Sequence, residues 1–174
     1  MTPEEFRTLY PLVFGWIRQT LATHSDEAKT VSSLGFPRLS QYFSGSLLSS
    51  TKAVVVERVP MPPLSCMGLS QFAAFENGDY NGVTYLDTFF VRRDSASIER
   101  LYFHELIHVV QWRLLGPEKF LALYANGLET QGYRDSPLEV MAYNAEDSFV
   151  QSDRVFDAES LVAQQLSQML GTTS

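Results

Sequence analysis

The segment His104-Glu105-Leu106-Ile107-His108 lies in the middle of an apolar stretch of this 174-residue sequence. Apolar residues recur around it at helical spacing, which predicts that all five residues belong to one helix. Side chains four residues apart on a helix point the same way, so both imidazoles can reach one metal ion. The carboxylate of Glu105 lies further round the helix and is free to hold a water molecule instead of the metal.

The same pattern could arise by chance on a buried helix, where a histidine is usually a core residue with a satisfied hydrogen bond. The chain has only three histidines, and two of them occupy this segment with a glutamate between them. Burying three ionisable side chains among apolar neighbours without a partner would cost on the order of several kcal/mol. The pattern therefore favours metal binding.

A catalytic zinc ion takes three protein ligands and leaves a fourth position to water, so another ligand must come from elsewhere in the chain. The best candidate is Glu139, which follows His108 by 31 residues, enough for a helix and a loop. Glu139 could instead complete a capping box with Ser136, whereas a cap at Asp135 would leave its carboxylate free. Weaker candidates for the third ligand are His24, Glu129, Glu146 and Asp147.

At these residues the sequence resembles the zincin metallopeptidases, and specifically their gluzincin branch. The segment 104–108 matches the histidine-pair motif in full, and Glu139-Val140-Met141-Ala142 is similar to the segment that carries the glutamate ligand. The resemblance implies one zinc ion held by His104, His108 and Glu139, with Glu105 as general base. In many of these families the next position is an aspartate, and here it is Tyr143, which leaves the partner of one histidine ligand unassigned.

The resemblance covers about residues 82–147, and the small size of the chain is similar to the minimal gluzincins. It implies a small twisted sheet whose edge strand, expected at about 66–76, receives an extended peptide. The reaction also needs a hydrogen-bond donor opposite the metal. Tyr143 lies one helical turn beyond Glu139, and Tyr133 lies in the preceding loop, but both could equally be packing residues.

The pattern of the whole chain predicts an α+β fold, zincin-like, in a single domain over 1–174. A small twisted sheet packs on an N-terminal helix and on the helix with the histidine pair, and further helices follow. The predicted strands are 52–58, 66–76 and 82–92, while 25–50 could be loop or short broken helices. Predicted helices run from Thr2-Pro3 to about 23, from Asp94 or Ser95 to 115, from 117 to about 127, from 135 onward and from about 158 to 170.

Several side chains near the motif receive no functional role from the sequence. Trp112, Phe89 and Phe90 are expected in the core. Gln111 and Arg134 could contact the site or lie on a solvated surface, and nothing in the sequence separates the two.

Composition limits the partners and the compartment. The formal charge of −7, without a basic run, argues against nucleic acid as a partner. No segment approaches the roughly 20 apolar residues of a membrane span. Cys66 is the only cysteine, which favours a reducing compartment, so we expect a cytoplasmic protein that acts on a peptide or protein substrate.

Two other functions remain open from the sequence. One is a catalytically silent zincin-like domain that keeps zinc for stability and serves as a binding module. The other is hydrolysis of non-peptide amides or esters at the same centre. Glu105 separates an enzyme from the silent domain, because a structural zinc site needs no base in that position.

Overall fold

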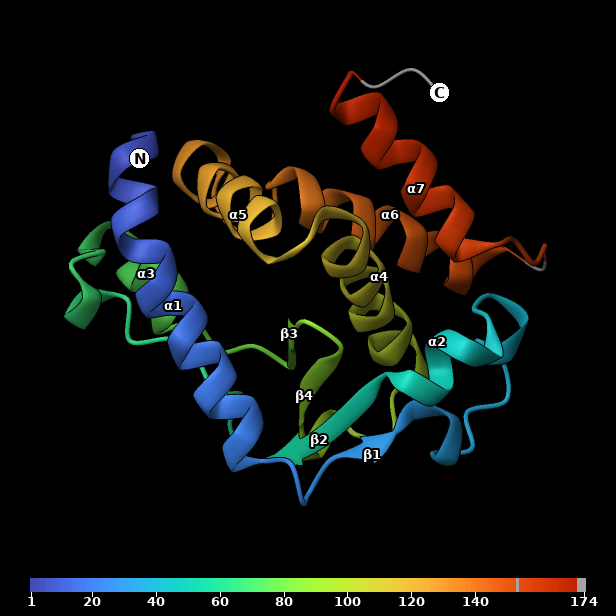
Figure 1. Cartoon of the computed structure of the whole chain (residues 1–174). Coiled ribbons are helices and arrows are strands. Elements are labelled where there is room, and N and C mark those ends of the chain that lie inside the picture. The colour runs from blue at the N-terminus through green and yellow to red at the C-terminus, as the bar shows by residue number, and fades with distance from the viewer. Residues whose placement is uncertain (153, 172–174) are drawn as a thin grey trace.

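The computed structural model describes residues 1–152 and 154–171, and it is an α+β structure with a small mixed sheet (Figure 1). The four strands of this sheet lie in the order β1 (Lys29–Thr30), β2 (Lys52–Val56), β4 (Thr88–Arg92) and β3 (Gly82–Tyr85). Strands β2 and β4 are parallel, while β1 and β3 run antiparallel to their neighbours at the two edges.

Seven α-helices lie within the described ranges. They are α1 (Pro3–Thr23), α2 (Gly45–Ser50), α3 (Ala73–Glu76), α4 (Glu99–Leu115), α5 (Pro117–Gln131), α6 (Pro137–Gln151) and α7 (Ala158–Met169). The predicted strand at 52–58 and the predicted helices at the N-terminus, around the histidine pair and toward the C-terminus are confirmed. Residues 25–50 form β1, two short 3-10 turns and α2.

Helix α4 lies at the centre of the molecule, with the sheet on one side and α5, α6 and α7 on the other (Figure 1). Every residue from Tyr102 to Trp112 is buried, so the helix is enclosed on all sides. Phe89 and Phe90 are fully buried in the same core, as predicted, and Trp112 stacks on Phe120 with ring centroids 3.9 Å apart. The helix that carries the histidine pair is therefore held rigidly by packing.

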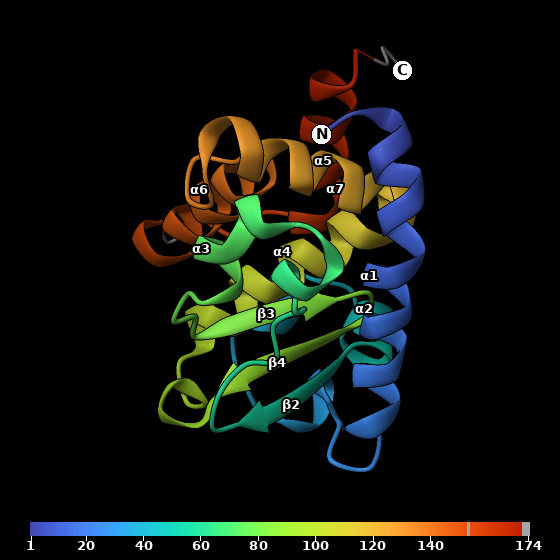
Figure 2. The same ribbon diagram turned by 90° about the vertical axis from the view of Figure 1, so that its left-hand side faces the viewer.

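Helix α1 runs along one side of the molecule and is less deeply buried than α4 (Figure 2). It begins with a capping box in which Thr2 and Glu5 bond each other's backbone, and Ile17 is its only buried residue. Its inner face meets a small second apolar cluster formed by Leu64, Leu69 and Phe72. Most of the apolar face of α1 is thus only partly covered.

The predicted strand at 66–76 is wrong. This segment forms two 3-10 turns, Ser65–Met67 and Ser70–Phe72, followed by α3. The amides of Cys66 and Phe72 donate to carbonyls three residues back, so they cannot join a strand ladder. The edge strand next to α4 is β3 instead.

The predicted single strand at 82–92 is also wrong, because it is a hairpin. Tyr85 pairs with Thr88 across a two-residue turn in which Leu86 has a positive φ of 59°.

Two helix limits differ from the prediction as well. Asp94 and Ser95 form a 3-10 turn before α4, and α5 continues past Gly127 to Gln131.

Within the described residues, no helix combines the length and the apolar character that crossing a bilayer requires.

Candidate metal centre

Three buried side chains from two helices converge on one point. The Nε2 atoms of His104 and His108, both on α4, lie 3.1 Å apart. The two carboxylate oxygens of Glu139, on α6, each face one of these nitrogens: Oε2 lies 3.4 Å from His104 Nε2, and Oε1 lies 3.4 Å from His108 Nε2. Among the described residues, this is the one group of three or more potential ligands whose donor atoms meet closely enough to share an ion.

The spacing of these donor atoms fits a tetrahedral metal ion. Zinc bonds to nitrogen and oxygen of about 2.0 to 2.1 Å, at tetrahedral angles, separate neighbouring ligand atoms by about 3.3 Å. The two nitrogens lie 3.1 Å apart and each lies 3.4 Å from its nearer Glu139 oxygen, and these separations agree with this value. A metal ion therefore fits between the three side chains with little movement.

The outer nitrogen of each imidazole is held by a hydrogen bond. His104 Nδ1 lies 3.0 Å from Glu146 Oε2, and His108 Nδ1 lies 2.8 Å from Gln111 Oε1. The Gln111 amide nitrogen donates to the carbonyl of Leu138 at 3.0 Å, so its oxygen must face the histidine. Both Nδ1 atoms thus donate, which leaves both Nε2 atoms free as ligands.

The carboxylate of Glu139 has one satisfied oxygen and one without a partner. The hydroxyl of Tyr124 donates to Oε1 at 2.6 Å, while Oε2 is buried without a hydrogen bond. Buried polar atoms nearly always have a partner, so a carboxylate oxygen that faces the His104 imidazole without a hydrogen bond is an atom that a cation would satisfy.

The competing role of Glu139 as a helix cap is not realised. Ser136 is the N-cap residue of α6, rather than Asp135, but it makes no capping hydrogen bond with its side chain. Glu139 points to the two histidines instead and is only 2% exposed. Its carboxylate is therefore available to a metal.

Glu105 lies beside the group and is fixed by the edge strand. Thr84 on β3 donates its hydroxyl hydrogen to Glu105 Oε2 at 2.6 Å. Gly82, two residues earlier, leaves the space that the carboxylate fills, because a Cβ atom there would overlap Glu105 Oε1. Strand β3 thus positions this carboxylate next to the two histidines.

The charges of the site favour a cation. Burial by itself would lower the pKa of His104, but the carboxylates of Glu139, 3.4 Å from its Nε2, and of Glu146, 3.0 Å from its Nδ1, outweigh burial and raise the pKa to about 10. Burial would raise the pKa of Glu139, yet the neighbouring His108 and His104 hold it well below its usual range. For Glu105 burial prevails and raises the pKa, against the opposing effects of the two histidines and Thr84.

The two candidate donors, Tyr133 and Tyr143, lie beside the group formed by His104, His108 and Glu139. The Tyr143 ring centroid is 4.6 Å from that of His104. Burial, together with the charge of Glu139, raises the pKa of both tyrosines, so both hydroxyls stay protonated at neutral pH. Arg134 stacks on Tyr143, with its guanidinium carbon 4.6 Å from the ring centroid.

The weaker ligand candidates lie outside the group. Glu146 holds the outer nitrogen of His104 instead of joining the three ligands. His24 pairs with Glu27, and Glu129 pairs with the N-terminal amine. Asp147 is exposed.

Three residues of the site were not assigned from the sequence. Gln111 follows His108 by one helical turn on the same face, and this spacing is a signal that could have identified it. Thr84 and Tyr124 carry no such signal, because their positions depend on how β3 and α5 pack against α4 and α6.

Comparisons of the chain with protein-family models, with curated protein sequences and with solved structures give no match.

Proposed function

We propose that the chain is a zinc-dependent metallopeptidase of the zincin type, with His104, His108 and Glu139 as the zinc ligands. The observation that carries the proposal is the convergence of three buried side chains whose facing donor atoms lie 3.1 to 3.4 Å apart, with both outer imidazole nitrogens already bonded. The same donors also suit non-haem iron(II), but the position of Glu105 favours hydrolysis and hence zinc. Zinc held in this way supplies a Lewis acid that activates water and polarises a carbonyl.

Glu105 is the proposed general base. Because Thr84 occupies its Oε2 atom, its Oε1 atom is the one that accepts a proton. Burial raises the pKa of this carboxyl, which suits a group that takes a proton from water and returns it to the leaving amine. Gly82 leaves the room that this carboxylate needs.

Tyr133 and Tyr143 are the proposed donors to the negative charge that develops on the carbonyl oxygen. Both hydroxyls stay protonated at neutral pH, and the ring of Tyr143 lies against that of His104. Donors fixed in place before the reaction stabilise such charge without reorganisation. The pair is therefore suited to this role.

The proposed position of a peptide substrate is along β3. This strand is hydrogen-bonded to β4 on one edge, and its residues Gly82 to Tyr85 line the cavity next to the metal centre. An extended peptide can add to the free edge of a strand.

The proposed compartment is the cytoplasm, because Cys66 is the only cysteine and free thiols persist where conditions are reducing.

The proposal is tested by separating metal binding from hydrolysis. Glu105→Gln should keep wild-type zinc content and lose at least about a hundredfold in hydrolysis of a proteome-derived peptide library. Glu118→Gln, on the exposed first turn of α5, is the matched control and should behave as wild type. A chelator should abolish wild-type cleavage.

Two outcomes would contradict the proposal. Zinc-loaded wild-type protein that cleaves no peptide supports the silent domain or a hydrolase of other amides or esters. Glu105→Gln with undiminished cleavage removes Glu105 from the mechanism.

A further inference from the structure

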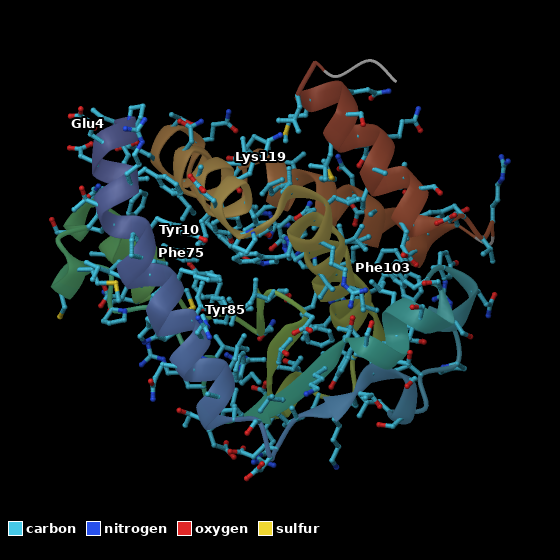
Figure 3. The ribbon with its side chains drawn as sticks, viewed as in Figure 1. Glu4, Tyr10, Phe75, Tyr85, Phe103 and Lys119 are labelled. Atoms are coloured by element: carbon cyan, nitrogen blue, oxygen red, sulfur yellow. The ribbon has the colours of Figure 1, made fainter. Side chains whose placement is uncertain are left out.

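A small cavity borders the candidate metal centre. It has a volume of about 110 Å³ and lies between α1, the segment 61–75, α5 and β3. Figure 3 shows Tyr10, Phe75 and Tyr85, three of its lining residues, on the side of α1 that faces the rest of the molecule. Helix α1 is thus one of the cavity walls.

The lining of the cavity is apolar except where it meets the metal centre. Glu105, His108 and Glu139 are the only acidic, basic or imidazole side chains among the lining residues that the structure describes. The other walls consist mostly of aliphatic and aromatic side chains, among them Leu9 and Val13 of α1. A group that enters the cavity from the metal centre is therefore apolar.

The free edge of β3, which also lines the cavity, is partly occupied. The Asn81 carbonyl accepts from the Arg92 amide at 2.8 Å across the hairpin. Backbone groups alternate along an antiparallel strand, so those of Gly82 and Thr84 point to the free edge. The Trp112 indole nitrogen donates to the Thr84 carbonyl at 3.1 Å. A substrate backbone can therefore pair with Gly82, whereas the next carbonyl of this edge is already taken.

This contact decides which part of a peptide substrate can enter the cavity. Thr84 and Trp112 both belong to the lining, so the edge group that Trp112 occupies lies at the cavity itself. Burying a peptide group among apolar walls without a hydrogen-bond partner is unfavourable. An apolar side chain of the substrate, rather than its backbone, therefore fits the cavity.

The volume of the cavity limits the size of that side chain. An apolar cavity of about 150 Å³ holds one benzene molecule, with its six carbon atoms. In proportion, 110 Å³ holds about four carbon atoms. The side chains of leucine and isoleucine have four carbon atoms, and that of phenylalanine has seven. The cavity thus suits a branched aliphatic side chain better than an aromatic one.

We infer that the substrate is cut next to an aliphatic residue of about the size of leucine, and that the side chain of this residue fills the cavity. The inference rests on the proposed function, because the scissile bond must lie at the metal centre for the neighbouring side chain to enter.

The test uses hydroxamates, which bind zinc directly and differ only in one side chain. The N-acetylated hydroxamates of alanine, leucine and phenylalanine are titrated calorimetrically into the zinc-loaded full chain. Each buried methylene group lowers Kd about fourfold, so the leucine derivative should bind about 50-fold more tightly than the alanine derivative. The phenylalanine derivative should bind more weakly than the leucine derivative.

The outcomes separate the inference from the proposed function. If none of the three hydroxamates binds, the proposed zinc centre is wrong and the inference falls with it. If they bind but leucine gives no lower Kd than alanine, or phenylalanine gives a lower Kd than leucine, the zinc centre stands and the inference is overturned.

Two substitutions on α5 should shift the preference in opposite directions. Ala125→Leu fills part of the cavity and should weaken binding of the leucine derivative at least tenfold while zinc content and binding of the alanine derivative stay unchanged. Leu128→Ala enlarges the cavity and should strengthen binding of the phenylalanine derivative at least tenfold. Ala122→Leu is the matched control, because Ala122 lies about one turn before Ala125 and is not a lining residue of the cavity. Zinc-loaded variants that keep the wild-type order of Kd values would overturn the inference.

Discussion

Gln111 on α4 offers a quantitative test of how the contact between α4 and α6 supports the candidate metal centre. Its side chain is fully buried and joins two groups, accepting from His108 Nδ1 at 2.8 Å and donating to the Leu138 carbonyl at 3.0 Å. The second bond links α4 to α6, the helix that carries Glu139. Replacing Gln111 by methionine keeps the shape and the helix propensity but removes both hydrogen bonds.

The expected cost follows from the two groups that lose their partners. A buried donor or acceptor left unsatisfied costs about 1 to 3 kcal/mol, so Gln111→Met should reduce the free energy of unfolding of the metal-free protein by on the order of 3 kcal/mol. The imidazole of His108 also loses its orientation. Removing such an outer hydrogen bond commonly weakens metal binding 10- to 100-fold, and we expect a zinc affinity lower by about that factor.

Urea denaturation of the metal-free protein gives the first quantity, and competition with a chromophoric chelator gives the second. Gln19→Met is the control, because Gln19 is exposed on α1 and its replacement should change stability by less than about 0.5 kcal/mol. The reasoning is refuted if Gln111→Met matches this control in both stability and zinc affinity.

Three further predictions address the core, a helix cap and the partner of Glu139. Phe103→Ala removes a fully buried ring that stacks on Phe149, and should lower the unfolding free energy by about 3 to 5 kcal/mol in chemical denaturation. Asp157→Ala removes the cap bonded to the backbone of Ser160 and should cost about 1 kcal/mol at pH 7. Because this backbone bond lowers the pKa of Asp157, the stabilisation is present above the unfolded pKa of about 3.9 and is lost as pH falls through the folded value, so the variant and the wild type should converge in stability in strong acid. Tyr124→Phe removes the donor to Glu139 Oε1 and should weaken zinc binding about tenfold in the chelator competition.

The sequence predicted the elements whose signals are local. The helix around His104 and His108 follows from apolar spacing, and the relative direction of the two imidazoles follows from helix geometry alone. Thr2, Pro3 and Glu5 marked the start of α1 because capping uses neighbouring residues. These features need no knowledge of distant contacts.

The errors arose where distant contacts or backbone conformation decide the structure. Nothing in residues 82–92 signals that Leu86 adopts a positive φ, which is uncommon for leucine, and so the sequence pattern predicts one strand where the structure has a hairpin. Residues 66–76 contain aromatic residues typical of strands, yet they satisfy their amides locally and pack under α1. The role of Thr84 depends on the register of β3 beside α4, and a single sequence does not contain that register.

The most direct test of the central claim is the zinc content of the purified chain, measured by inductively coupled plasma mass spectrometry after zinc loading and desalting. The wild-type chain should hold one zinc ion, and His104→Ala, which removes one of the three converging donors, should hold none. Wild-type protein that keeps no zinc, or His104→Ala that keeps a full equivalent, would contradict the assignment of His104, His108 and Glu139 as a metal centre.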